Sequence, residues 1–185
     1  LNLSWRYGWS DRIEVGIDLP VVSHNQGFLD SPVERWHDLF GLSNANRDGQ
    51  RNQLRFFYGQ PGPAGLLLDS PATGFGDLRI SAAYAINGSA DGGLALRSTL
   101  KLPTGDEDKL MGSGAADLTL GLYHTDNQFF SRQSLAATAF AGILLLGDGE
   151  VLSQRQKDTV GYAGASLTWQ ISDRFAINGQ LYGQS

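Results

Sequence analysis

The sequence predicts an all-β protein, an antiparallel transmembrane β-barrel of the outer-membrane kind with one short helix in an external loop. Apolar and polar residues alternate with period 2, short and long connections alternate, and aromatic residues gather near the short connections. We expect about 8–10 strands in this chain and up to about 12 in the full protein. The chain begins inside a strand pattern without a starting methionine or a signal peptide, so residues 1–185 are expected to form one barrel domain that is a fragment of a longer barrel. The alternative is that eight strands of this chain close into a small barrel.

The first two strands show the alternation most clearly. Apolar residues stand at every second position of Leu1–Trp9 and again of Ile13–Leu19, and polar residues or glycine lie between them. Further strands are expected at 78–86, 94–102, 118–122, 130–146, 160–171 and 174–183. Their length of about 9–11 residues is what a tilted strand needs to cross a bilayer.

The connections between these strands differ in length. Short turns are predicted at Ser10–Asp11, Asn87–Gly93, Thr125–Gln128 and Ser172–Asp173. Long connections are predicted at Pro20–Gly76, Pro103–Gly114 and Gly147–Asp158. Outer-membrane barrels combine short periplasmic turns with long external loops, so the long connections are expected on the external side.

The longest connection, residues 20–76, is predicted to hold a helix at 32–41. Ser31 is a suitable N-cap, Pro32 suits the first helical position, Glu34 completes a capping box, and Gly41 provides a stop. Four residues share one face of this helix at helical spacing: Val33, Trp36, His37 and Phe40. A helix of two turns is not stable alone, so we expect this face to dock.

The same connection is predicted to hold a β-hairpin at 51–70, in which "NQLRFFYG" and "AGLLLD" flank a "QPGP" turn. Two further spanning strands are the alternative. Phe56, Phe57 and Tyr58 of the hairpin are the nearest docking partners for the helix. The helix then either restricts the barrel mouth or is a static lid.

Alternation alone does not say which face of the sheet is inside, since a soluble barrel places its apolar face inward. The aromatic residues favour the membrane alternative, because they lie on the apolar face near the short turns. These form an expected aromatic girdle of Trp9, Tyr84, Phe129, Trp169 and Phe175. Ordinary core aromatics are the other interpretation. The polar face then carries the charges of the lumen: Arg6, Arg12, Glu14, Asp18, Asp77, Arg79, Arg97, Lys101 and Asp117.

Three segments carry a resemblance to a known family. They are "YGWSDRIEVGIDLPVVSHNQGFLDSPVERWHDLFGL", "GFGDLRISAAY" and "LRSTLKLPTGDEDKLMGSGAADLTLGL". They resemble the domain of unknown function 3187 family of Gram-negative outer-membrane proteins, over residues 5–125. The last segment also resembles an outer-membrane channel family of phenol-degradation pathways. The first resemblance implies the location and the barrel, and it implies no catalytic residues.

Composition and motifs limit the chemistry. The net charge is −5 without a basic run, so nucleic acid is not an expected partner, and the absence of cysteine excludes thiol catalysis and thiolate metal sites. His24, His37 and His124 lack an evident serine partner, and Ser113 lacks the strand–turn–helix context of a nucleophile elbow. The acidic loops have no calcium-binding spacing. No catalytic residue, metal or cofactor is therefore predicted.

A narrow porin-like channel for small or hydrophobic solutes follows as the expected function, because a barrel of more than about eight strands leaves room inside. A structural barrel with a sealed, ion-paired interior is the alternative, and an outer-membrane lipid hydrolase is a further one. The expected partners are outer-membrane lipid, lipopolysaccharide and the barrel-assembly machinery during insertion.

Overall fold

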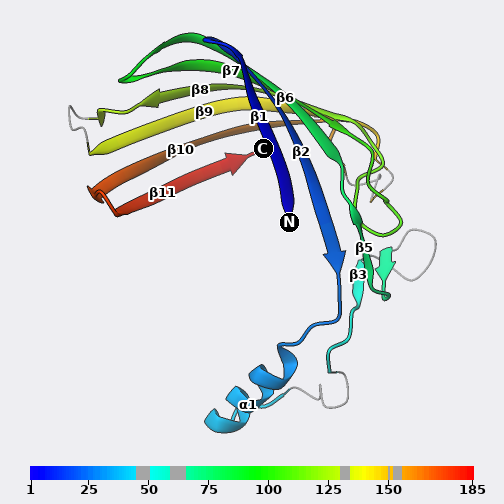
Figure 1. Cartoon of the computed structure of the whole chain (residues 1–185). Helices are drawn as coiled ribbons and strands as arrows, with labels where there is room; N and C mark the ends of the chain where they lie inside the picture. Colours follow the sequence, from blue (N-terminus) through cyan, green and yellow to red (C-terminus); the bar gives the residue numbers. More distant parts are fainter. Residues whose placement is uncertain (45–50, 59–65, 130–133, 150, 152–155) are drawn as a thin grey trace.

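The computed structural model describes residues 1–44, 51–58, 66–129, 134–149, 151 and 156–185. One antiparallel sheet of nine strands dominates it, in the order β1-β2-β6-β7-β8-β9-β10-β11, with β5 paired to β2 (Figure 1). The long strands are β1 (Asn2–Ser10), β2 (Ile13–His24), β6 (Leu78–Ser89), β7 (Gly92–Leu102), β8 (Asp117–Asp126), β9 (Leu135–Leu146), β10 (Thr159–Ser172) and β11 (Phe175–Gln184). Every neighbouring pair is antiparallel, as the alternation and the turn spacing predicted.

The sheet is strongly curved, but it does not close into a barrel. Within the described residues, β1 pairs only with β2 and β11 pairs only with β10, so these two strands are the edges of the sheet. The all-β class, the antiparallel order and the single short helix of the prediction are confirmed. The closed ring of strands is not observed.

Strand β2 continues past Pro20, where the prediction ended it. Residues Val21–His24 pair with β5 (Ala72–Phe75), so β2 has β6 as its neighbour along one part and β5 along the next. Pro20 lies between these two ladders, and its carbonyl accepts a hydrogen bond from the N–H of Gly76 at 2.8 Å. A proline is tolerated where the ladder changes partner, because no N–H is required there.

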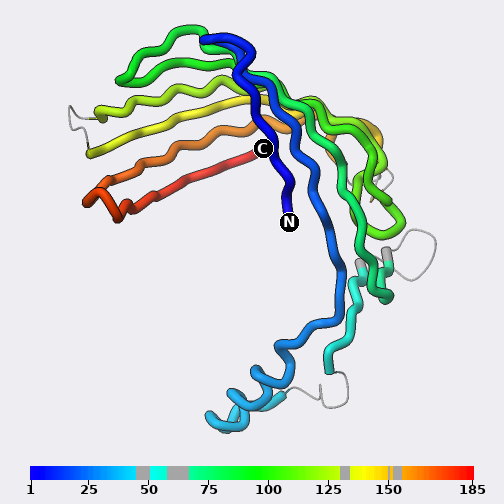
Figure 2. Tube along the Cα trace, in the orientation of Figure 1, coloured from blue at the N-terminus to red at the C-terminus, as the bar shows by residue number. Residues whose placement is uncertain are grey.

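The excursion that follows β2 contains helix α1 (Asp30–Phe40) and the short hairpin of β3 (Phe56–Tyr58) and β4 (Leu66–Leu68). The predicted "QPGP" turn at residues 60–63 lies outside the described residues. The trace leaves the sheet at the end of β2, passes through α1 and returns to β5 (Figure 2). Figure 1 shows α1 away from the main sheet.

The predicted capping of the helix is wrong. The helix begins at Asp30 with Leu29 at the N-cap, and no side chain caps it. Asp30 instead accepts a hydrogen bond from the N–H of Asn52 at 2.6 Å, and Glu34 pairs with Arg51 at 2.5 Å. These contacts with residues 51–52 replace the local capping box. Gly41 ends the helix as predicted, with a φ of 65° that favours glycine.

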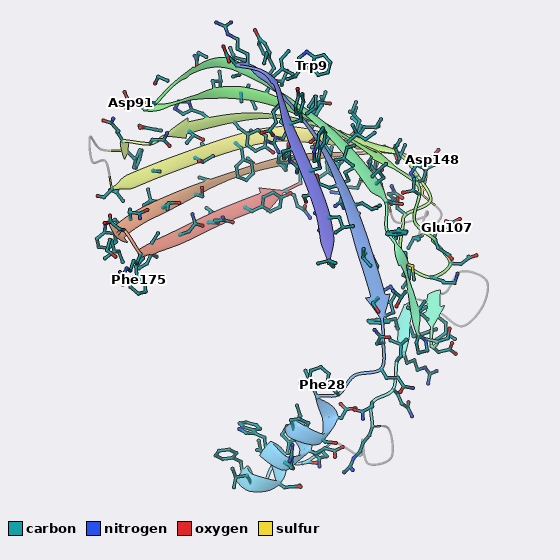
Figure 3. The ribbon with its side chains drawn as sticks, in the orientation of Figure 1. Trp9, Phe28, Asp91, Glu107, Asp148 and Phe175 are labelled. Carbon is teal, nitrogen blue, oxygen red and sulfur yellow. The ribbon has the colours of Figure 1, made fainter. Side chains whose placement is uncertain are left out.

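The two ends of the sheet are different. Asp91 and Phe175 mark the end with short turns, and Glu107 and Asp148 mark the end with long connections (Figure 3). The predicted strand start near residue 130 lies outside the described residues; β9 is described from Leu135. The buried apolar side chains of the described chain all lie among the long connections: Leu54, Leu68, Met111 and Ala115. The sheet itself therefore has no apolar core on either face.

Candidate functional site: the polar face of the sheet

The strand register sorts the side chains of the sheet into an apolar face and a polar face. One transverse row of the apolar face contains Trp5, Ile17, Ile80, Leu100, Leu118 and Leu145. The neighbouring row on the polar face contains Ser4, Asp18, Arg79, Lys101 and Asp117. Large apolar side chains are exposed on the first face, as in Trp5 at 53% and Ile80 at 42%.

Ion pairs join charged side chains on the polar faces of β1, β2 and β7. Arg6 pairs with Asp18 through a single nitrogen, with Nη2 at 3.0 Å from Oδ1 and 2.8 Å from Oδ2. Ser4 also donates its hydroxyl to Asp18 Oδ1 at 2.6 Å. Arg97 reaches Glu14 at 3.2 Å across β6, where the small Ala83 stands between them in the register. Side chains from two strands on either side of β6 therefore meet on this face.

Lys101 lies at the centre of the largest cluster. Its ammonium is 2.5 Å from Asp117 Oδ2 and 3.4 Å from Asp77 Oδ2, and it also donates to the hydroxyl of Ser113. The pair of Lys101 and Asp117 was predicted. These groups hold the connection between β7 and β8 against the end of the sheet, because Ser113 lies in that connection. Asp117 also accepts a hydrogen bond at 3.2 Å from the N–H of Gly147, which begins the connection between β9 and β10.

Asp77 anchors this connection with both carboxylate oxygens. Oδ1 accepts from the N–H of Gly105 and Oδ2 from the N–H of Ser113, each at 3.0 Å. Burial raises the pKa of Asp77, but these two hydrogen bonds and the charge of Lys101 outweigh it, so the pKa lies below its usual value of 3.8. Gly112 is required beside it, because a Cβ there would overlap Asp77 Oδ1.

Two of the predicted lumen charges stand apart from these clusters. Arg79 is exposed, between Asp18 and Lys101 in the register. Arg12 is not on a strand, and its predicted place on the polar face is wrong. The hydroxyl of Ser10 accepts hydrogen bonds from the N–H groups of Arg12 and Ile13, at 3.3 and 3.2 Å. Arg12 therefore lies in the turn between β1 and β2.

The serine and the histidines considered for a hydrolase have other partners in the structure. The hydroxyl of Ser113 accepts a hydrogen bond from Lys101, and Lys101 also pairs with Asp77 and Asp117. His24 contacts the carbonyl of Leu110 at 3.3 Å, and His37 contacts Asn44 at 2.7 Å. Neither histidine has a serine among these partners. His124 lies on the apolar face, opposite Leu94.

On β8 to β11 the same polar face of the sheet carries four aromatic rings instead of ion pairs. We call Tyr123, Phe140, Tyr162 and Tyr182 the aromatic row. Their ring centroids are 5.5 Å apart from Tyr123 to Phe140, 6.3 Å from Phe140 to both Tyr162 and Tyr182, and 6.5 Å from Tyr162 to Tyr182. The row crosses four successive strands.

Glycines lie beneath the aromatic row. A Cβ at Gly121 or Gly142 would overlap the phenol of Tyr162, and a Cβ at Gly164 would overlap the ring of Phe140. The rings therefore lie low over the backbone of neighbouring strands. The register explains the fit, because Gly142 is opposite Tyr162 and Gly164 is opposite Phe140.

The alternation did not predict the aromatic row, because it gives the face of each side chain but not its neighbours on the adjacent strands. A signal was present in three strands as an aromatic residue and a glycine two positions apart. The pairs are Gly121 with Tyr123, Phe140 with Gly142, and Tyr162 with Gly164. Each pair shares one face of its strand, since strand side chains alternate.

Four of the five predicted girdle residues lie exposed on the apolar face near the short turns: Trp9, Tyr84, Trp169 and Phe175. Tyr84 is opposite Ile13, the first residue of β2, and Trp169 is opposite Leu135, the first of β9. Phe129 is half-buried in the turn after β8 instead of on a strand. A band of aromatic side chains thus follows one end of the apolar face.

The predicted helix face is present but does not cover the sheet in this structure. Trp36 and Phe40 contact each other at a centroid distance of 4.9 Å and are 54% and 60% exposed. Val33 is also exposed, and His37 lies 5.7 Å from the ring of Trp36. Phe56 contacts His24 of β2, with ring centroids 6.0 Å apart. The role of the helix as a constriction stays a prediction.

The fold and this face define an all-β protein whose single curved antiparallel sheet has one exposed apolar face and one polar face. Residues 1–184 match the family described as Protein of unknown function (DUF3187). The chain belongs to this family, as its resemblance indicated. No curated protein matches the chain. Among the described residues, no helix has the length and apolar character needed to span a membrane.

Proposed function

We propose that the chain forms part of the wall of an outer-membrane β-barrel whose polar face lines a narrow passage for small solutes. The observation that carries this proposal is the exposed apolar face. Large apolar side chains cover it from β1 to β11, whereas water-soluble proteins rarely expose apolar patches larger than a few hundred Å². Lipid is the solvent in which such a face is stable.

Two further observations support a bilayer. Connections are short at one end of the sheet and long at the other, as in outer-membrane barrels. Exposed aromatic residues follow the end with short turns, where a membrane interface would lie. A barrel in lipid also requires partners for the edges of β1 and β11, because unpaired backbone groups are costly there.

The membrane contact is tested with two tryptophan positions at one depth. In full-length protein that retains only Trp5, lipids brominated along their chains should quench its fluorescence, because Trp5 lies on the apolar face. The matched variant replaces Trp5 with phenylalanine and carries Ser4→Trp on the opposite face. Its fluorescence should be quenched by aqueous iodide instead. Equal behaviour of the two variants would refute the orientation.

The passage is tested by the conductance of the full-length protein in planar bilayers. Discrete ion currents from folded, inserted protein are expected. A structural barrel with a sealed interior is the second candidate, and the ion pairs of Arg6 with Asp18 and of Glu14 with Arg97 favour it. Inserted protein that conducts no ions would refute the channel and leave the structural barrel.

A further inference from the structure

We propose that the aromatic row is a binding site for the sugar rings of a neutral saccharide. The inference rests on the proposed passage, because the polar face must be open to solutes. It deepens that proposal by naming a substrate class, and it depends on the side chains of β8 to β11 alone.

The shape of the row is the first argument. Because their side chains lie over glycine backbone, Phe140 and Tyr162 rest on the sheet instead of projecting from it. Tyr123, Phe140 and Tyr162 are half-buried, and Tyr182 is exposed at 57%. The four rings thus form one continuous aromatic surface across four strands. Such a surface contacts the C–H faces of a ring-shaped solute by burying apolar area.

The surroundings of the row are the second argument. Uncharged hydroxyl and amide side chains share the same face: Thr119, Thr125, Thr138, Ser166, Thr168, Gln170, Asn178, Gln180 and Gln184. Several already form hydrogen bonds in this plane, such as Thr125 with Thr138 at 3.1 Å and Asn178 with Thr168 at 2.7 Å. In the strand register of this region, Asp117 is the single charged residue on the polar face, and Lys101 neutralises it.

These two features together select the ligand class. A charged solute would find its partners on the polar face of β1 to β7, where the arginines and acidic residues lie. A purely apolar solute would leave the hydroxyl and amide groups unused and partly desolvated, which is unfavourable. A saccharide presents apolar C–H faces and a rim of hydroxyl groups, so it matches both the rings and their neighbours.

Binding is measured by calorimetry on the full-length protein refolded in detergent, with maltotriose as the probe, so the readout does not require conduction. Tyr182→Leu should weaken maltotriose binding about five- to tenfold, because one stacking surface is lost. The matched control is Tyr84→Leu, which removes an exposed tyrosine from the apolar face and should leave binding unchanged. Tyr123→Leu is the second variant if Tyr182→Leu does not fold.

The outcomes separate this inference from the proposed function. Three results would each overturn the saccharide site. They are no maltotriose binding by folded wild-type protein, binding of phenol in place of maltotriose, and an equal loss of binding in Tyr182→Leu and Tyr84→Leu. Conductance without saccharide binding would leave the channel standing and remove the site. Saccharide binding without conductance would leave the site and remove the channel.

Discussion

Replacing Lys101 with methionine should destabilise the end of the sheet more than any other single change to a charged side chain on β7. The substitution keeps most of the apolar stem and removes the ammonium. Lys101 is 14% exposed, and its partners Asp77 and Asp117 are 7% and 11% exposed. The variant therefore leaves two nearly buried carboxylates without their cation.

The magnitude follows from this burial. Removing one partner of a buried ion pair costs about 3–5 kcal/mol, because the remaining charge is desolvated without compensation. The N–H groups of Gly105 and Ser113 still stabilise Asp77, so we expect about 3 kcal/mol, at the lower end of that range. The free energy of unfolding is measured by urea titration of refolded protein, with tryptophan fluorescence as the signal.

Arg79→Met is the matched control, because Arg79 is the cross-strand neighbour of Lys101 and is exposed. It should change the free energy of unfolding by less than about 0.5 kcal/mol. If Lys101→Met costs no more than Arg79→Met, the cluster does not stabilise the fold and the reasoning is wrong.

The pH dependence of stability provides a second readout of the same cluster. The pKa of Asp77 is lower in the folded protein than its usual value of 3.8, so its carboxylate stabilises the fold above that pH. This contribution should be lost as the pH falls below 3.8 and through the folded-state pKa. Urea titrations at a series of acidic pH values should show the loss in wild-type protein and a smaller one in Asp77→Asn. An equal loss in both would contradict this role.

Three further predictions concern other parts of the chain. Leu3→Arg on the apolar face should cost about 2–4 kcal/mol in lipid vesicles, while Ser4→Arg should cost less; equal costs would reverse the assignment of the faces. Gly112→Ala should lower the unfolding midpoint, because the added Cβ overlaps Asp77. Gly88→Ala should not lower it, because a Cβ at residue 88 meets open space; equal midpoints of the two variants would exclude the overlap. Deleting residues 30–43 should enlarge single-channel conductance if the helix restricts the passage. Unchanged conductance with lower thermal stability would show that the helix only packs against the fold.

Local alternation made most of the fold predictable. The side chains of a strand alternate between faces, so Leu3, Trp5 and Tyr7 indicated both a strand and its apolar side from sequence alone. The ion pair of Lys101 with Asp117 was predictable for the same reason, since both residues stand on polar faces of adjacent strands. These features depend on residues that are close in sequence or joined by one connection.

Features that depend on distant residues were not predictable in this way. Pro20 indicated the end of a strand, but pairing with residues 72–75 extends β2 beyond it. Ser31 and Glu34 satisfied a local capping rule, but Arg51 and Asn52 provide the partners that the first helical turn contacts. Tertiary contacts override local preference in both cases.

The charges of the polar face lead to a last prediction, on ion selectivity. Four cationic side chains and four acidic ones share this face and the cluster at its end: Arg6, Arg79, Arg97 and Lys101, and Glu14, Asp18, Asp77 and Asp117. Seven of the eight belong to ion pairs: Arg6 with Asp18, Arg97 with Glu14, and Lys101 with both Asp77 and Asp117. Paired charges produce little net field, and strong selectivity requires a ring of one sign. A passage lined by this face should therefore distinguish weakly between cations and anions.

In a planar bilayer with a salt gradient, the reversal potential should lie close to zero. A reversal potential near the Nernst value of either ion would show that unpaired charge, such as that of exposed Arg79, controls the passage.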